Sequence, residues 1–175
     1  MPSPNPETLS PRHSIVDRDS RGAALLCGTA ALILISTGAG MLEGHAIYQS
    51  WRDLAGFADF ASYHSDYGRA LLPFLPLPLV LATLGNIWLL RRRPDSVPRG
   101  LVLATLLGQV VVLLVTATLA LPIQIQLGTP GNSPEEIVAL VDRLIVVGYL
   151  RELPGLAVAA GFIVMLYLAV RGRAR

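Results

Sequence analysis

The chain has 175 residues, of which 53% are hydrophobic and only 15% are charged, and its formal net charge is +2. A soluble domain carries about 25% charged residues, so this composition excludes an ordinary soluble protein and is typical of an integral membrane protein. The basic residues, all arginine, form no patch of the kind that binds nucleic acid, and we expect no nucleic-acid partner.

The ends of the chain differ in composition from its middle. Residues 1–20 are rich in Pro, Ser and Asn and lack an apolar periodicity, which predicts a disordered tail because too little apolar surface is present to fold. Residues 21–171 are predicted to form one transmembrane domain, and residues 172–175 a short basic end. The lone cysteine, Cys27, is expected to be a packing residue.

Four apolar stretches are long enough to cross a bilayer, which takes about 20 residues. The predicted spans are residues 22–42, 70–90, 101–121 and 153–170. The first is longer than the apolar region of a signal peptide, about 7 to 15 residues, and we interpret it as a retained anchor rather than a cleaved signal. The sequence therefore predicts an all-α integral membrane bundle of four transmembrane helices.

Small residues within the spans predict where helices approach closely. These residues are Gly38, Gly40, Gly85, Gly108 and Gly161.

The charges of the loops alternate along the chain. The N-terminal segment, the loop between the second and third spans, and the C-terminus are basic, whereas the other two loops lean acidic. Because arginine is retained on the cytoplasmic side, this pattern predicts a multi-pass protein of the cell membrane with both termini cytoplasmic. The arginines of the basic regions are Arg12, Arg18, Arg21, Arg91, Arg92, Arg93, Arg99, Arg171, Arg173 and Arg175.

Both outer loops contain helical patterns. In the first, an apolar stripe at helical spacing predicts an amphipathic helix at the membrane interface. In the second, Ser133, Pro134 and Glu136 have the spacing of a capping box, which predicts a helix start. Pro154 should kink this helix where it enters the membrane. The residues of the stripe are Trp51, Leu54, Phe57, Ala58 and Ala61.

Polar and titratable residues gather at the outer end of all four spans, beside three prolines of the second span, Pro73, Pro76 and Pro78. Irregular backbone at membrane depth is tolerated where it lines a cavity, so the pattern favours an outer-facing pocket. The alternative is a simple kink with an interfacial aromatic belt. The candidate residues are Glu43, His45, Tyr63, His64, Tyr67, Gln124, Arg151 and Glu152.

His64 is the first candidate among them, since an imidazole with an unperturbed pKa of about 6.5 suits acid–base work near neutrality. Arg151 and Glu152 either bind an anionic group or snorkel to the headgroups. Asn86 and Gln109, nearer the inner side, are expected to join helices. No metal-ligand spacing and no cofactor motif is present, and we expect neither a metal nor a cofactor.

Several short motifs share their order with a known family. They comprise Phe60, Tyr63, His64 and Tyr67 before the second span, RRRP with Pro98 and Arg99 after it, Thr116, Leu119 and Pro122–Gln124 at the end of the third span, and LVDRLIVVGYLRELPGLAVA leading into the fourth. In these features the chain resembles a family of small four-helix bacterial membrane proteins, most of them of unknown function, that also includes the anthrone oxygenases. The chain departs from that family beside Arg151, where Gly148 and Glu152 occupy positions that are often Asn and Thr.

The resemblance implies a cofactor-free oxidation of a lipophilic aromatic substrate. A base deprotonates an activated carbon acid, and the resulting anion reacts with oxygen. His64 would be the base, and Arg151 with Tyr63 or Tyr67 would stabilise the anion. Glu43, His45, Gln124 and Glu152 would contact the substrate. The alternative is a membrane protein without enzymatic activity that binds a lipid, a small hydrophobic ligand or a membrane partner.

Overall fold

The bundle consists of helices that are joined by short turns and loops. The computed structural model describes the backbone of residues 11–173 and the side chains of residues 20–172, and this part of the chain contains no strand. Its elements are α1 Pro11–Leu42, η1 Glu43–Ile47, α2 Tyr48–Asp53, α3 Phe60–Leu71, α4 Pro76–Arg92, α5 Arg99–Val115, η2 Thr116–Ala120, α6 Leu121–Leu127 and α7 Pro134–Arg173. The π-helical turns η1 and η2 connect α1 to α2 and α5 to α6 without interrupting the helices.

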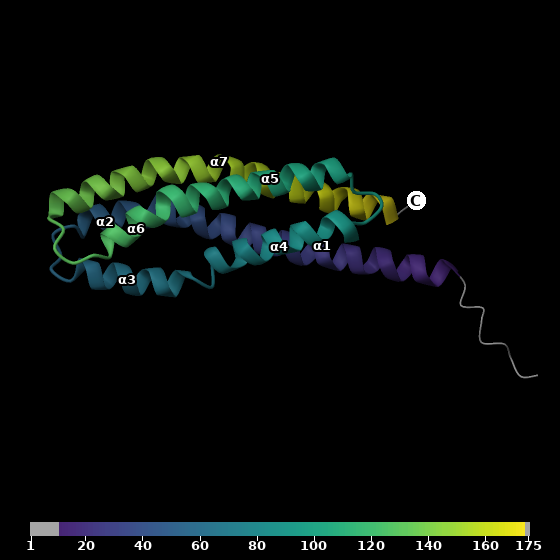
Figure 1. Ribbon diagram of the computed structural model, residues 1–175, viewed down its shortest axis with the longest axis horizontal. Helices are drawn as coiled ribbons and strands as arrows, with labels where there is room; N and C mark the ends of the chain where they lie inside the picture. Colours follow the sequence, from purple (N-terminus) through teal and green to yellow (C-terminus); the bar gives the residue numbers. More distant parts are fainter. Residues whose placement is uncertain (1–10, 174–175) are drawn as a thin grey trace, which may run out of the picture.

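These elements form four rods that lie side by side along the long axis, with the start of α1 and the end of α7 at the same end (Figure 1). The rods cover Ser20–Asp53, Phe60–Arg92, Arg99–Leu127 and Pro134–Gly172, and each is long and apolar enough to cross a membrane. At about 1.5 Å per residue each exceeds the hydrocarbon core of about 30 Å. The predicted all-α bundle of four transmembrane helices is confirmed, and its helices extend beyond the predicted spans.

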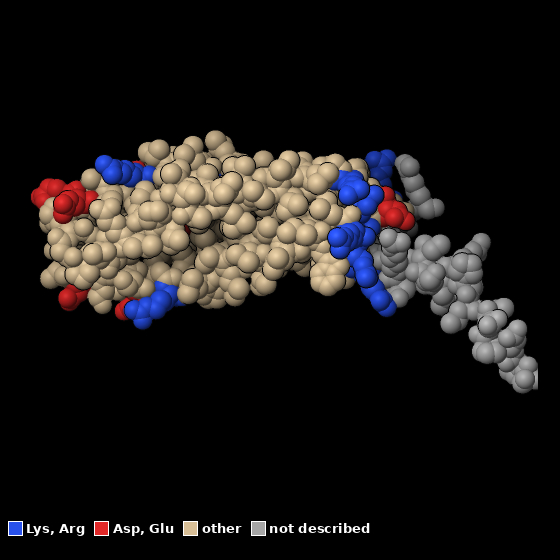
Figure 2. Space-filling view, in the orientation of Figure 1, with Lys and Arg blue, Asp and Glu red and all other residues tan. Residues whose placement is uncertain are grey.

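The surface and the interior have the polarity expected in a lipid solvent. Trp88, Leu107 and Leu153 are exposed, whereas Asn86 and Gln109 are fully buried. Figure 2 shows charged residues toward the two ends of the visible face and a broad uncharged band between them. A multi-pass membrane protein accounts for this distribution, because lipid tails solvate the apolar side chains that water would reject.

The buried apolar residues fall into two clusters along the bundle axis. The first joins α1, α4, α5 and α7 around Leu26, Leu89 and Phe162. The second joins α2, α3, α6 and α7 around Trp51, Leu127 and Leu144. Along the chain, Glu43 and Arg151 each lie between residues of the first cluster and residues of the second.

Three of the five predicted glycine contacts are tight. A Cβ on Gly108 would come within 2.5 Å of Val158 on α7, and one on Gly161 within 2.5 Å of Thr105 on α5; Gly85 is equally close to Thr29 on α1. Because glycine has no side chain, the backbones of neighbouring helices approach each other closely at these points. Gly38 instead faces open space and Gly40 makes only an ordinary contact with Leu75, so the prediction was wrong for Gly38.

Two predictions for the ends of elements need correction. The tail was expected to be disordered over residues 1–20, but α1 begins at Pro11; residues 1–10, 174 and 175 lie outside the described part. The amphipathic helix of the first outer loop is α3, which begins at Phe60 rather than near Trp51. Its buried residues are Phe60 and His64, one turn apart, whereas Phe57 and Ala58 of the predicted stripe are exposed.

The break before Pro76 and the capping box at Ser133 agree with the sequence, whereas the kink expected at Pro154 stays a prediction. The second rod breaks at Leu72–Leu75, and Pro76 begins α4 at a position where a missing N–H costs nothing. Ser133 N donates to Glu136 Oε2 at 2.7 Å, and Glu136 N donates to Ser133 Oγ at 3.2 Å, which completes the capping box at the start of α7. The helix α7 continues through Pro154.

Candidate functional site

Glu43 and Arg151 form a buried ion pair between the two apolar clusters. Together with Tyr48 and Gln124 they make up what we call the polar layer. Arg151 Nη2 of α7 lies 3.6 Å from Glu43 Oε2 of η1, with side-chain exposures of 11% and 3%. Two such charges attract by about 4 kcal/mol at an effective dielectric of 20. Removing each ion from water costs several kcal/mol, so the pair needs further hydrogen bonds to be stable.

Tyr48 and Gln124 supply those hydrogen bonds. Arg151 Nη2 donates to the Tyr48 hydroxyl at 3.1 Å. The amide of Gln124 donates to Glu43 Oε1 and to the Tyr48 hydroxyl, both at 3.4 Å. Three of the four rods therefore contribute one or more groups to a single network. Removing one member would leave other buried groups unsatisfied.

The π turn η1 explains why Glu43 and Tyr48 point the same way. In an α-helix, residues five apart lie on different faces, but here the N–H of Tyr48 donates to the carbonyl of Glu43, five residues earlier. That wider turn stacks the two side chains. Gly44 within it also leaves room for Glu152, whose Oε1 would lie 2.7 Å from a Cβ at this position.

The second π turn, η2, lies in the third rod, before Gln124. The N–H of Leu121 donates to the carbonyl of Thr116, and Pro122 then lacks the N–H that a regular helix would use. The wider turn changes the helical phase of α6, the helix that carries Gln124. Single π turns are frequent at functional sites, and both turns in the described residues contribute to this one.

His64 reaches the layer from α3. Its Nε2 donates to the backbone carbonyl of Gln124 at 3.1 Å, and the absence of a side chain at Gly128 leaves room beside its ring. Trp51 contacts the ring edge-on at a centroid separation of 4.5 Å, and Phe60 stacks at 5.9 Å. Because a carbonyl only accepts, Nε2 carries the hydrogen. In the neutral ring, Nδ1 then holds a lone pair, and it has no partner among the described residues.

A cavity of about 520 Å³ opens beside this layer, between α3 and the start of α4 on one side and η2 and α6 on the other. Figure 2 shows a hollow near the middle of this face. Polar walls are provided by Glu43, His64, Tyr67, Gln124 and Arg151. Much of the remaining wall is aliphatic and comes from Leu71, Leu72, Leu75, Ala120, Leu121 and Ile125. The volume is within the range of small-molecule sites, about 300–1,000 Å³.

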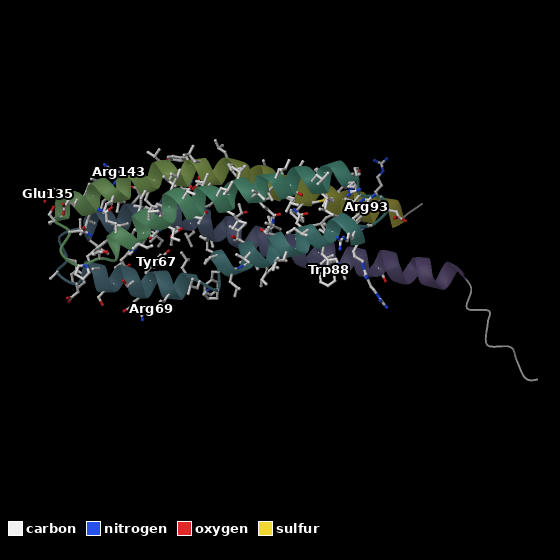
Figure 3. The ribbon with its side chains drawn as sticks, in the orientation of Figure 1. Tyr67, Arg69, Trp88, Arg93, Glu135 and Arg143 are labelled. Carbon is white, nitrogen blue, oxygen red and sulfur yellow. The ribbon has the colours of Figure 1, made fainter. Side chains whose placement is uncertain are left out.

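Tyr67 and Arg69 lie on different faces of α3. Tyr67 points toward α6, whereas Arg69 points away from the bundle (Figure 3). Tyr67 also contacts the edge of Trp51 at a centroid separation of 5.3 Å. Its hydroxyl and ring are therefore available to the cavity.

The remaining candidates are divided between the flank of the site and the surface. His45 Nε2 lies 3.1 Å from Glu152 Oε2, but the imidazole is 54% exposed and does not line the large cavity. Tyr63 is exposed on α3 and does not line this cavity either. The structure therefore brings Glu43, His64, Tyr67, Gln124 and Arg151 together, and it leaves Tyr63 outside.

Tyr48 and Trp51 belong to the site although they were not among the candidates. Both are fully buried, and their rings lie 5.2 Å apart. Their position in the sequence, between Glu43 and the first outer turn, was a signal that they lie near the site. In a regular α-helix, however, Tyr48 and Glu43 would lie on different faces, so the spacing did not reveal that they meet.

Within the described residues, no group of three or more His, Cys, Asp or Glu side chains is placed to hold a metal ion. The hydrogen-bond donors of the polar layer are instead suited to bind an oxygen atom of an organic molecule. In comparisons with known proteins, no family model, no curated protein and no solved structure matches the chain.

We predict that Arg151→Met destabilises the protein by about 3–5 kcal/mol, because Glu43 is then buried without its counter-charge. The double variant Glu43→Gln with Arg151→Met should recover part of this loss. Thermal unfolding in detergent, followed by circular dichroism, measures both. Arg143→Met is the control, since Arg143 is exposed on the same helix. Equal unfolding midpoints for Arg151→Met and Arg143→Met would show that the pair is not stabilising.

Proposed function

We propose that the protein binds a lipophilic aromatic molecule with an anionic or carbonyl oxygen in the cavity beside α3. The position of Arg151 in the cavity wall is the observation that carries this proposal. Its Nη2 makes the described contacts with Tyr48 and Glu43. Since a guanidinium has five N–H donors, those on Nε and Nη1 are available for an oxygen of the ligand.

The apolar part of the ligand is matched by the rest of the cavity. Leu72, Leu121 and Ile125 line it and are exposed on rods long enough to span a membrane, so a lipophilic molecule can reach it from the bilayer. Tyr67 offers a ring for stacking, which contributes about 0.5–1.5 kcal/mol beyond buried area for an aromatic pair. An aromatic ligand is therefore favoured over a purely aliphatic one.

The orientation proposed is in the cell membrane with both termini cytoplasmic. The loop between α4 and α5 carries Arg91, Arg92 and Arg93, and the last turns of α7 carry Arg171. The opposite end carries Glu135 and Glu136 at the start of α7. Arginine is retained on the cytoplasmic side, so the cavity would belong to the outer half of the bundle.

A second candidate function is oxidation of the bound molecule by oxygen, without a cofactor. The specific observation that favours it is the Nδ1 lone pair of His64, which is buried and has no partner among the described residues. His64 is one of the residues that line the cavity, and an imidazole that presents this nitrogen to a substrate suits the removal of a proton from an activated CH₂ group. Arg151 and Tyr67 would stabilise the enolate oxygen that forms.

The steps of this oxidation balance with oxygen as the oxidant. His64 takes a proton from the CH₂ group, and the carbanion gives its electrons to O₂ to form a peroxide. The peroxide takes up the proton as a hydroperoxide, and loss of water then leaves a carbonyl. The sum is R₂CH₂ plus O₂ giving R₂C=O plus H₂O.

The binding proposal predicts a preference for an anionic ligand. In lipid nanodiscs, 9-anthracenecarboxylate should quench tryptophan emission at lower concentration than 9-anthracenemethanol, after subtraction of protein-free nanodiscs. Arg151→Met should weaken binding of the carboxylate about tenfold or more and change binding of the alcohol little. Arg143→Met should behave as the wild type. The proposal is wrong if Arg151→Met retains the carboxylate preference.

The oxidation candidate predicts that anthrone in nanodiscs consumes oxygen and yields anthraquinone. His64→Gln keeps an N–H donor for the Gln124 carbonyl but has no basic nitrogen, so turnover should fall about 10²–10⁴-fold while 9-anthracenecarboxylate still binds. His45→Gln, outside the cavity, is the matched control and should retain turnover. Full turnover by His64→Gln would eliminate the base assignment.

The orientation predicts different labelling of the two ends. In the Cys27→Ser background, Asp95→Cys in the α4–α5 loop should resist a membrane-impermeant maleimide in intact cells and react after lysis. Glu135→Cys at the opposite end should react in intact cells. The reverse pattern would place the basic end outside.

A further inference from the structure

A groove lies on the surface of the bundle between α1 and α4, near the basic loop that follows α4. It is lined by Arg21 and Leu25 of α1 and by Trp88 and Arg92 of α4. Its volume is about 160 Å³, which is below the range of small-molecule sites, roughly 300–1,000 Å³. The groove therefore fits one group of a larger molecule. It shares no residue with the cavity beside α3, so an inference about it does not depend on the proposed function.

Helical geometry gives this groove a charged end and an apolar end. Arg21 and Leu25 are four residues apart on α1 and lie on one face of that helix. The same spacing relates Trp88 and Arg92 on α4. Because the two helices run in opposite directions (Figure 1), both arginines lie toward the end of the bundle. Leu25 and Trp88 lie about 6 Å further into it, at about 1.5 Å per residue.

Gly22 brings the two arginines to the same level of the bundle. A Cβ at this position would come within 2.5 Å of the backbone carbonyl oxygen of Arg92, so a larger residue would force α1 and the end of α4 apart. Arg21 precedes Gly22 in the sequence, and both arginine side chains are exposed. Two guanidiniums that line one small groove repel each other, and an anion between them offsets this repulsion.

The groove lies where the headgroups of a bilayer would meet its hydrocarbon region. Leu25 and Trp88 fall within the first and second predicted spans, and the two arginines lie just outside them. Trp88 is 60% exposed and lies at the edge of the bundle (Figure 3), as is typical of an aromatic side chain at a membrane interface. Figure 2 shows basic side chains gathered at this end of the visible face. The matching occupant is anionic at one end and lipophilic at the other.

We propose that this groove binds the headgroup of an anionic phospholipid. The oxygens of a phosphodiester accept hydrogen bonds from the planar N–H fork of an arginine, and clustered arginines beside a membrane favour anionic lipids. The upper parts of the acyl chains then lie along Leu25 and Trp88. A zwitterionic lipid carries the same phosphate, but its own ammonium group competes with the arginines. The site therefore prefers phosphatidylglycerol to phosphatidylcholine.

Quenching of tryptophan emission by brominated lipids measures this preference at the groove itself. The chain has two tryptophans, of which Trp51 is fully buried and Trp88 is exposed. The protein is reconstituted in bilayers with equal amounts of phosphatidylglycerol and phosphatidylcholine, and one or the other lipid is brominated on the upper part of an acyl chain. Composition and surface charge are then the same in both samples. The ratio of phosphatidylglycerol to phosphatidylcholine at Trp88 should exceed that of the bilayer about threefold or more.

Variants of exposed arginines separate the groove from the general charge of this end. Arg21→Gln and Arg92→Gln should each remove roughly half or more of the excess of phosphatidylglycerol, because each takes away one of the two guanidiniums. Arg99→Gln is the matched control, since Arg99 is exposed at the start of α5 and does not line the groove. It removes the same charge from the same end and should keep the preference. Trp88→Phe should abolish the difference between the two bilayers.

Three results would overturn the proposal. A wild-type ratio equal to that of the bilayer would show that the groove has no preference. A ratio that stays unchanged in both Arg21→Gln and Arg92→Gln would show that these arginines do not bind the lipid. A ratio that Arg99→Gln lowers as much as they do would assign the preference to the overall charge. All three replaced side chains are exposed, so the variants should fold as the wild type does.

Discussion

The Glu43 carboxylate and the Arg151 guanidinium are buried together within the bundle, and much of its outer half is arranged around this ion pair. Glu43 and Arg151 attract each other less strongly than the two ions lose in hydration. The layer is stable because Tyr48 and Gln124 complete the hydrogen bonding. It separates the apolar interior into two clusters, one in the predicted membrane region and one beyond it.

The two π turns provide the backbone geometry that this layer needs. One extra residue in a turn rotates everything after it by about 100° relative to a regular helix. At η1 this rotation aligns Tyr48 with Glu43, and at η2 it sets the direction of Gln124. The broken helix between α3 and α4 lies beside the same layer. Irregular backbone in the bundle thus coincides with polar chemistry, as expected where a cavity is lined.

The two proposed functions use one cavity and differ in a single feature. Binding requires the free donors of Arg151 and apolar walls reached from the lipid. Oxidation also requires the lone pair of His64, which the hydrogen bond to the Gln124 carbonyl directs to Nδ1.

The sequence by itself determined the number of spans, the capping box at Ser133 and the break near Pro76. It also placed Glu43, His64, Tyr67, Gln124 and Arg151 at the same end of the bundle. Each follows from local rules: the length of an apolar run, the missing N–H of proline, and the end of the span to which a residue belongs. Only the tertiary structure decided that Tyr48 joins the site, that Tyr63 faces outward, and that α3 begins at Phe60. The reason is helical phase, because a π turn or a broken helix changes which face a residue occupies without leaving a regular spacing in the sequence.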